Sequence, residues 1–236
     1  MKEHLETAPV REAVQGDNTC PICQLRRMIE QQTVERYLGG AVMEPDIRLQ
    51  TNAVGFCAAH HQRLMAQKDY HGYALMMQTR LRQVSQDIAP AIQQLRGGLF
   101  ERKRLPAARA RVASATSRCL ICENTSRTID RYLDIFMKLY REDSAFRQDF
   151  ERCAGFCLAD LPQALDHAQS SLSAEQRKSF CANAAAQLER ATQTAQADLD
   201  ALCSSFHYGS EEKNNPRIHQ ALERAVNLLR GETFEL

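Results

Sequence analysis

The chain has 236 residues, 44% hydrophobic and 25% charged, which is ordinary for a soluble globular protein. Its formal net charge of +1 excludes a global field that would draw the chain to nucleic acid or to an anionic membrane. The amino-terminal segment has no apolar run typical of a signal peptide or membrane span, so we expect a cytoplasmic protein whose nine cysteines serve metal ligation, redox chemistry or burial rather than disulfides.

The first half of the chain predicts a short helical unit that contains two cysteine motifs. Cys20-Pro-Ile-Cys23 opens it, and Gly55-Phe56-Cys57-Ala-Ala-His60 follows after a polar segment, MEPDIRLQTN. That segment is interpreted either as a turn capped by Asp46 or as a small polar site against a metal. Apolar spacing and the lack of helix breakers predict helices over 24–38, 58–68 and 71–96, the last bent at Pro90.

Residues 97–118 interrupt this pattern and are interpreted as a linker. With Arg96 included, the segment has six Arg and one Lys against one Glu. A solvated, flexible connector accounts for this composition, and a docking strip for an acidic partner or RNA is the alternative. Phe100 is its one aromatic residue, so a stacking platform is lacking and nucleic acid is not favoured.

The second half repeats the order of motifs. Cys119-Leu-Ile-Cys122 is followed by Gly155-Phe156-Cys157-Leu-Ala-Asp160. Helices are predicted at about 120–141, 156–168 and 173–206. A terminal helix is expected in NNPRIHQALERAVNLLR, with Asn215 as N-cap and Pro216 at its first position.

The two halves predict an internal duplication. The Cys-x-x-Cys motifs are offset by 99 residues and the Gly-Phe-Cys motifs by 100, in the same order. We therefore expect an all-α protein of two pseudo-repeated metal-binding units plus a C-terminal helix. The expected boundaries are 1–96 for the first unit, 97–118 for the linker and 119–236 for the second, degenerate unit.

Three stretches of the first half carry a resemblance to a known family. They are DNTCPICQL, YLGGAVMEPDIRLQTNAVGFCAAHHQRL and YHGYALMMQTRL. They resemble an uncharacterised bacterial domain family, common in anaerobes, with Cys-Pro-x-Cys, Met-Glu-Pro-Asp-x-Arg and Gly-Phe-Cys-x-x-His motifs. The resemblance covers roughly residues 1–96, and only the two cysteine motifs persist in the second half. It supports the architecture and implies no activity.

Within the first half, Cys20, Cys23, Cys57 and His60 are the candidate metal ligands. Two residues between paired ligands allow both side chains to reach one ion, and two such pairs complete a tetrahedral shell. His60 is preferred to the adjacent His61, because a separation of three residues from Cys57 keeps both ligands on one helical face.

Within the second half, Cys119, Cys122 and Cys157 are the corresponding ligands, and the fourth position is open. Asp160 replaces the histidine and provides a carboxylate ligand, Cys153 offers a four-cysteine set one helical turn earlier, and an empty, degenerate site is the third possibility. Cys181 and Cys203 lack paired spacing and are expected to be buried.

These sites favour zinc, one or two ions per chain, with an iron–sulfur cluster as the alternative cofactor. The sequence contains no phosphate-binding glycine loop, nucleophile elbow or His-Glu-x-x-His motif, so no catalytic residue is assigned. We therefore expect a zinc-binding helical protein, a non-enzymatic protein-interaction or regulatory module. A thiol or iron–sulfur redox protein is the alternative. Another protein is the expected partner, no membrane is involved, and the 173–206 helix leaves a homodimer open.

Overall fold

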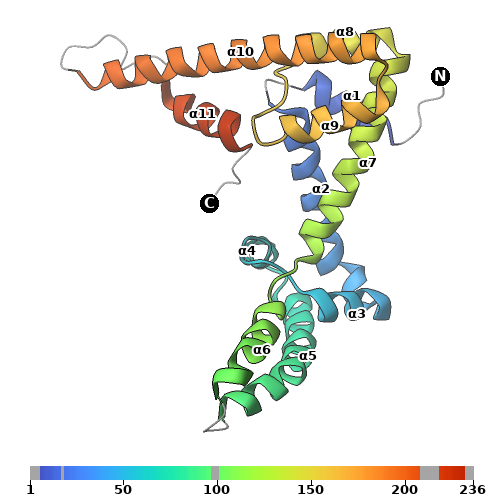
Figure 1. Ribbon diagram of the computed structural model, residues 1–236, viewed down its shortest axis with the longest axis vertical. Coiled ribbons are helices and arrows are strands. Elements are labelled where there is room, and N and C mark those ends of the chain that lie inside the picture. The colour runs from blue at the N-terminus through green and yellow to red at the C-terminus, as the bar shows by residue number, and fades with distance from the viewer. Residues whose placement is uncertain (1–5, 17–18, 97–100, 208–217, 232–236) are drawn as a thin grey trace. The chain divides into compact units, whose positions relative to one another are not determined.

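The computed structural model describes residues 6–16, 19–96, 101–207 and 218–231, and this part of the chain is helical without a β-strand (Figure 1). The prediction of an all-α fold is confirmed. The helices are α1 (Ala8–Gln15), α2 (Pro21–Leu38), α3 (Pro45–Val54), α4 (Ala58–Ala66), α5 (Tyr70–Arg96), α6 (Glu101–Ser114), α7 (Leu120–Glu142), α8 (Ser144–Arg152), α9 (Leu161–Ser171), α10 (Ala174–Ser205) and α11 (Ala221–Arg230), with 3-10 turns at Gly40–Met43 and Ile218–Gln220.

The chain divides into two compact units whose boundaries differ from those expected. Unit 1 comprises Met1–Arg27 and Ile129–Leu236, and unit 2 comprises Met28–Thr128. Helix α2 therefore begins in unit 1 and ends in unit 2, while α7 begins in unit 2 and ends in unit 1. As a result, unit 1 contains the first Cys-x-x-Cys and the second Gly-Phe-Cys, and unit 2 contains the first Gly-Phe-Cys and the second Cys-x-x-Cys.

Unit 1 is built around a cluster of aromatic rings. Phe150 and Phe180 stack with centroids 5.4 Å apart, and Phe136 makes edge contacts to both. Side-chain caps begin the helices that supply them: Asp143 accepts hydrogen bonds from two amides at the start of α8, and Ser173 forms a capping box at α10. Helix α11 packs back along α10 (Figure 1).

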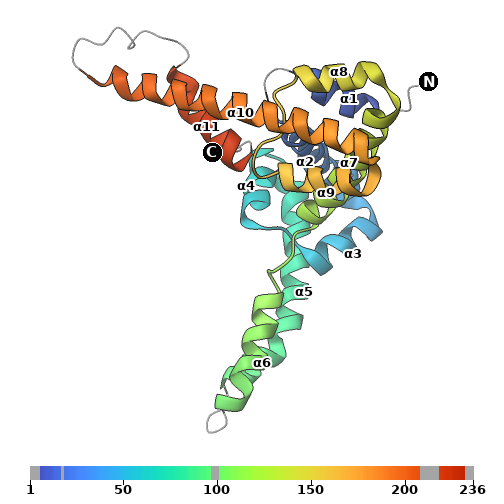
Figure 2. The same ribbon diagram turned by 45° about the horizontal axis from the view of Figure 1, so that its top comes forward.

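Unit 2 has an aliphatic core with fewer rings. Helices α3 and α4 pack on the first half of α5, and α6 returns alongside the second half of α5 as a helical hairpin (Figure 2). The core residues are Val34, Tyr37, Leu38, Val42, Ile47, Phe56, Leu64, Met76, Cys119, Leu120 and Ile121.

Most of the predicted helices are present, and the differences are local. The helix expected over 156–168 begins only at Leu161, and α5 continues through Pro90. The polar MEPDIRLQTN segment forms α3, in which Pro45 occupies the first turn and Glu44, rather than Asp46, is the N-cap residue. Residues 101–114, expected to be a flexible connector, form α6. The expected Asn215 cap lies outside the described residues. None of the described helices combines the length and the apolarity needed to cross a membrane.

Candidate metal centres

Both Gly-Phe-Cys motifs form the same tight turn, one in each unit. Gly55 and Gly155 have φ angles of 77° and 82°, a left-handed conformation that favours glycine. The next residue, Phe56 or Phe156, is buried in the core of its unit. The motif therefore uses glycine to turn the chain and phenylalanine to anchor it, which fixes the position of the cysteine that follows.

The centre in unit 2 consists of Cys57, His60, Cys119 and Cys122, whose ligand atoms all lie within 4.8 Å of one another. The Nδ1 atom of His60 faces three sulfurs, at 3.2 Å from Cys57, 3.3 Å from Cys119 and 3.4 Å from Cys122. The Cys57 and Cys122 sulfurs are 3.8 Å apart. Helix α4 supplies the histidine, and the start of α7 supplies the Cys-x-x-Cys pair.

A buried carboxylate supports the histidine of this centre. Glu30, on α2, places Oε1 at 3.7 Å from His60 Nε2, and its other oxygen accepts a hydrogen bond from Arg63. Glu30 is 5% exposed and His60 is 4% exposed, so this contact is shielded from solvent. A carboxylate on Nε2 favours the tautomer whose Nδ1 lone pair faces the sulfurs, an arrangement common around zinc-bound histidine.

Hydrogen bonds to backbone carbonyls join the two segments of unit 2 that carry metal ligands, the Gly-Phe-Cys turn and the Cys-x-x-Cys at the start of α7. The Leu120 amide donates to the Gly55 carbonyl at 2.9 Å. The Arg80 guanidinium donates to the carbonyls of 52–54 at the end of α3, and at 2.5 Å to that of Ala115. Because these carbonyls lack partners within α3, Arg80 caps the helix and also joins the segment before Cys119 to the Gly-Phe-Cys turn.

The centre in unit 1 consists of Cys20, Cys23, Cys157 and Asp160, and all four residues are buried. The Oδ2 atom of Asp160 lies 3.6 Å from the Cys20 sulfur, 3.2 Å from that of Cys23 and 3.3 Å from that of Cys157. The Cys23 and Cys157 sulfurs are 3.8 Å apart. Asp160 therefore takes the place that His60 has in the other unit.

An arginine orients the aspartate of this centre. Arg26 Nη2 donates to Asp160 Oδ1 at 2.6 Å and Arg26 Nη1 donates to Oδ2 at 3.1 Å, a bidentate pair. Arg26 lies three residues after Cys23 on α2, so one helical face carries both a ligand and the residue that positions another. The backbone bond of Leu120 has no counterpart here, because the equivalent residue is Pro21, which lacks an amide hydrogen.

The carboxyl-terminal helix covers the unit 1 centre. The Leu158 amide, one residue after Cys157, donates to the Leu228 carbonyl of α11 at 2.8 Å. A Cβ atom on Gly231, just after α11, would lie 3.1 Å from the Cys23 sulfur, and its φ of 80° also favours glycine. A cavity of ≈ 740 Å³ between α10 and α11 is lined by the three cysteines of this centre and by Cys153.

The structure brings together all eight predicted side chains, but not in the predicted sets. The set of Cys20, Cys23, Cys57 and His60 is wrong, as is the set of Cys119, Cys122, Cys157 and Asp160. The reason is the length of the helix after each Cys-x-x-Cys. Helix α2 has 18 residues and carries the chain roughly 27 Å from Cys20. The following α3 packs on α5 instead of running back along α2, so the first Gly-Phe-Cys meets the second Cys-x-x-Cys.

The remaining cysteines and His61 lie outside both sets. Cys153 accepts hydrogen bonds from the Gly155 amide at 3.4 Å and from the Gln187 side chain at 3.6 Å, so the alternative four-cysteine set is not formed. Cys181 and Cys203 are exposed, contrary to the expectation of burial. His61 points away from the sulfurs and contacts the Tyr73 hydroxyl.

Charge within each cluster is concentrated on one thiol. Burial opposes a charged His60, yet its hydrogen bond to Cys119 raises the pKa of His60 to about 10. Burial likewise opposes a thiolate at Cys119, but the hydrogen bond from His60 lowers the pKa of Cys119 to about 6. Hydrogen bonds from Cys20 and Cys23 lower the pKa of Cys157 to about 2. In unit 2 the sulfurs thus stabilise a positive charge on His60, and a metal ion would supply that charge in place of the Nδ1 proton. Thiolates are the form that binds metal.

The donor atoms fit a tetrahedral zinc ion. Zinc–sulfur distances of about 2.3 Å place two ligand sulfurs roughly 3.8 Å apart in a tetrahedral shell. One sulfur pair in each centre has this separation: Cys23 and Cys157 in unit 1, and Cys57 and Cys122 in unit 2, are both 3.8 Å apart. Three sulfurs with one imidazole nitrogen, or with one carboxylate oxygen, belong to the donor types that zinc accepts. Both clusters can therefore hold a metal ion.

Sequence reasoning missed the residues that position the ligands. Arg26 follows Cys23 by three residues and Arg63 follows His60 by three, so the helical period was an available signal for both. Glu30 and Arg80 gave no such signal, because their partners lie far away in sequence: Glu30 contacts His60 on α4, and Arg80 donates to carbonyls at the end of α3.

Comparison with known proteins identifies a family but adds no activity. No curated protein and no solved structure matches the chain. One family model does match, over residues 1–235, so the similarity extends well beyond the roughly 1–96 inferred from the motifs. The chain therefore belongs, over nearly its whole length, to a family of unknown function (DUF6062).

Proposed function

We propose that this protein is a cytoplasmic, zinc-stabilised helical module that acts by binding another protein and catalyses no reaction. The observation that carries the proposal is the pair of four-residue clusters, each with its ligand atoms within 4.8 Å. A supporting ion pair lies against each cluster: Arg63 with Glu30, and Arg26 with Asp160. Hydrogen-bonding partners that orient the ligand side chains are typical of metal sites in proteins.

The ligand count favours a structural role for the ions. Each cluster provides four protein ligands, which fills a tetrahedral shell, whereas catalytic zinc keeps one position for water or substrate. Each centre also joins segments that are distant in sequence. Cys23 and Cys157 are separated by 134 residues and Cys57 and Cys122 by 65, so an ion restrains a long loop. The ions are proposed to stabilise the fold on which a binding surface is displayed.

A redox protein is the second candidate, and the grouping of three thiols in each cluster favours it. Iron–sulfur clusters are held by cysteine thiolates, and the lowered pKa values of Cys119 and Cys157 are consistent with thiolate ligands. The unit 2 centre, whose Cys122 is exposed, is the better placed of the two for exchange with a soluble partner, because all four ligands of the unit 1 centre are buried.

Anaerobic purification followed by elemental analysis and visible spectroscopy separates the two candidates. We expect a colourless protein with two zinc ions per chain and no iron, and loss of helical signal when a strong chelator removes the zinc. Visible absorption that bleaches on reduction, together with iron and acid-labile sulfide, would replace the proposal with the redox alternative. A chain whose melting curve is the same with and without metal would refute the structural role.

A further inference from the structure

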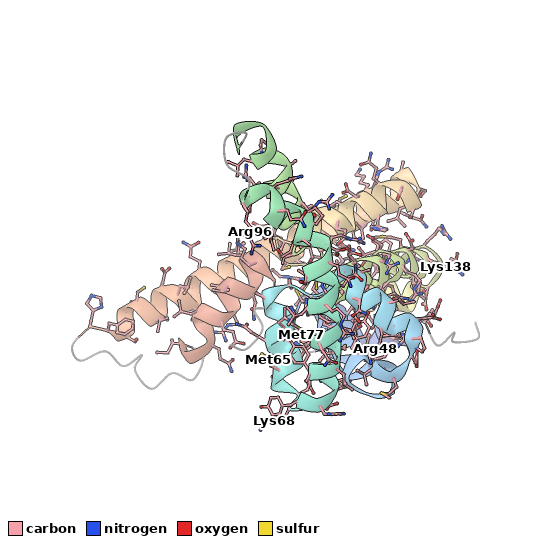
Figure 3. The ribbon with its side chains drawn as sticks, turned by 90° about the horizontal axis from the view of Figure 1, so that it is seen from below. Arg48, Met65, Lys68, Met77, Arg96 and Lys138 are labelled. Carbon is pink, nitrogen blue, oxygen red and sulfur yellow. The ribbon has the colours of Figure 1, made fainter. Side chains whose placement is uncertain are left out.

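The α5–α6 hairpin, which we call the arm and define as residues 77–114, has almost no core of its own. From Met77 to the end of α5, Ala91 is the one buried residue. On α6, among residues 105–114, Ala108 is the one buried residue. Earlier in α5, Gly72 and Met76 are buried in the core of unit 2. The arm begins where that core ends, and Met77 and Arg96, labelled in Figure 3, are the first and last residues of its α5 part.

Large apolar side chains on the arm face solvent. Leu81, Leu95 and Leu105 are 61%, 50% and 54% exposed, and Ile92 and Val112 are 37% and 44% exposed. Their spacing is helical: Leu95 follows Ile92 by three residues, and Val112 follows Leu105 by seven, so each helix presents an apolar face. Among the arm side chains that the structure describes, only Ala91 and Ala108 are buried, and Val84 and Ile88 are half-buried. The hairpin therefore buries little apolar surface, although most helical stability comes from packing.

The arm is also the most basic part of the chain. Residues 77–114 contain seven Arg and one Lys against Asp87 and Glu101, a net charge of +6 in a chain whose total is +1, and Arg118 follows just after the arm. Some of these residues are engaged, such as Arg80 at the turn below the arm and Arg118 with Glu123. Arg82, Arg96 and Arg109 are exposed and flank the apolar positions. Charge and apolar surface are therefore displayed together.

We propose that the arm docks an acidic amphipathic helix of another protein, which completes a helical bundle with α5 and α6. The proposal rests on the binding role suggested above and is independent of which metal the clusters hold. Leu81, Leu95 and Leu105 would pack against the apolar face of the incoming helix, and Arg82 and Arg96 would pair with its flanking carboxylates. Such a helix supplies both the apolar contacts and the opposite charge that the arm lacks.

The charge and composition of the arm argue against other occupants. The arm of a second copy carries the same charge, so packing arm against arm would bring like charges together. Single-stranded nucleic acid is bound through stacking on aromatic side chains, and Phe100 is the one aromatic residue in 77–118. Exposed aliphatic residues interleaved with arginine fit a protein helix better than a phosphate backbone.

A fluorescence anisotropy titration of the full, metal-loaded chain tests the proposal. The probe is a labelled synthetic peptide of Leu and Glu, with Leu at heptad a and d positions. Its control is a peptide of the same composition in scrambled order, which keeps the charge and loses the apolar face. We expect the amphipathic peptide to bind about tenfold more tightly than the scrambled one. Both peptides can pair with the arginines of the arm, but only the amphipathic peptide has an apolar face that can pack on its leucines.

Matched variants assign the binding to the arm. The double variant R82E and R96E and, separately, L95S and L105S should each weaken binding by about tenfold. The control double variant K138E and K178E reverses two charges on exposed residues of α7 and α10, and it should bind as the parent chain does. Circular dichroism and metal content of every variant confirm that it is folded.

Three outcomes would overturn the proposal: equal affinity for both peptides, equal losses in the arm and control variants, or tighter binding of an RNA duplex of about 16 bp than of the peptide. If the chain holds two zinc ions and ignores the peptide, the arm proposal fails while the structural role of the metal stands. If the chain is found to contain no zinc and still binds the peptide as expected, the arm proposal stands and the structural role of the metal fails.

Discussion

Paired cysteine-to-serine substitutions distinguish crossed ligand sets from sets formed within each half of the chain. In the structure, Cys23 shares a centre with Cys157, and Cys57 belongs to the other centre. The double variant C23S/C157S therefore damages one centre, whereas C23S/C57S damages both. Under the pairing expected from the sequence, the effects of these two variants would be exchanged.

The structure gives the size of the expected effect. The Cys23 sulfur lies 3.2 Å from Asp160 Oδ2 and 3.8 Å from the Cys157 sulfur, so its loss leaves three ligands in an incomplete shell. We expect one metal ion per chain in C23S/C157S and none in C23S/C57S. Structural zinc contributes about 10–16 kcal/mol in small domains, and net stabilities are about 5–15 kcal/mol, so a unit that loses its ion should unfold.

Native mass spectrometry counts the ions, and circular dichroism measures the helix that remains. C23S/C157S should keep the helical signal of unit 2, and C23S/C57S should lose most of the total. The control C181S/C203S removes two exposed cysteines outside both centres and should retain two ions. One ion in C23S/C57S together with none in C23S/C157S would refute the crossed sets.

Three further predictions concern the residues around the centres and one helix cap. Glu30→Gln removes the charge beside His60 and should weaken metal binding in unit 2 by about 10–100-fold in a chelator competition assay, with the unit 1 affinity unchanged. Arg26→Ala frees the Asp160 carboxylate and should produce a loss of about the same size in unit 1 alone; equal losses in both centres would contradict the assignment. Asp143→Ala removes the α8 cap and its ion pair to Arg11, and should cost about 1 kcal/mol in chemical denaturation at neutral pH. Because hydrogen bonding to Arg11 lowers the pKa of Asp143, this contribution is present above the ordinary carboxyl pKa and is lost as the pH falls through the lowered value. A difference between Asp143→Ala and the parent that persists in strong acid would contradict that cause.

The sequence predicted which residues are candidate metal ligands, but not which of them share a centre. Cys-x-x-Cys and Gly-Phe-Cys-x-x-His or Asp are local patterns, and their chemistry can be read from spacing alone. The pairing depends on where α2 and α7 deliver the chain, and local spacing contains no such information. The expectation that ligands near in sequence bind together was reasonable for a compact repeat, and it failed because the helix after each cysteine pair is long.

The helices missed in the sequence share a physical cause. Helix α8 has nine residues and α3 has ten, and helices this short give a weak periodic signal in the sequence. Helix α6 was interpreted as a connector because its apolar residues are few and its charge is high. A helix without a buried face has no sequence signature of burial, and for the same reason α6 is a candidate for binding a partner.

The order of the ligands along the chain has a consequence for biosynthesis. All four ligands of the unit 2 centre fall between Cys23 and Cys157 in the sequence, so the unit 2 ligands form an inner set and the unit 1 ligands an outer set along the chain. During synthesis the inner set is the first to be completed, and Cys20 and Cys23 must wait for more than half of the remaining polypeptide before their own partners emerge. During that interval the first Cys-x-x-Cys and the first Gly-Phe-Cys are both available to the same ion. Under the proposed metal role, an ion bound during this interval would join the wrong pair of motifs, so binding after Cys157 and Asp160 have been made favours the native sets.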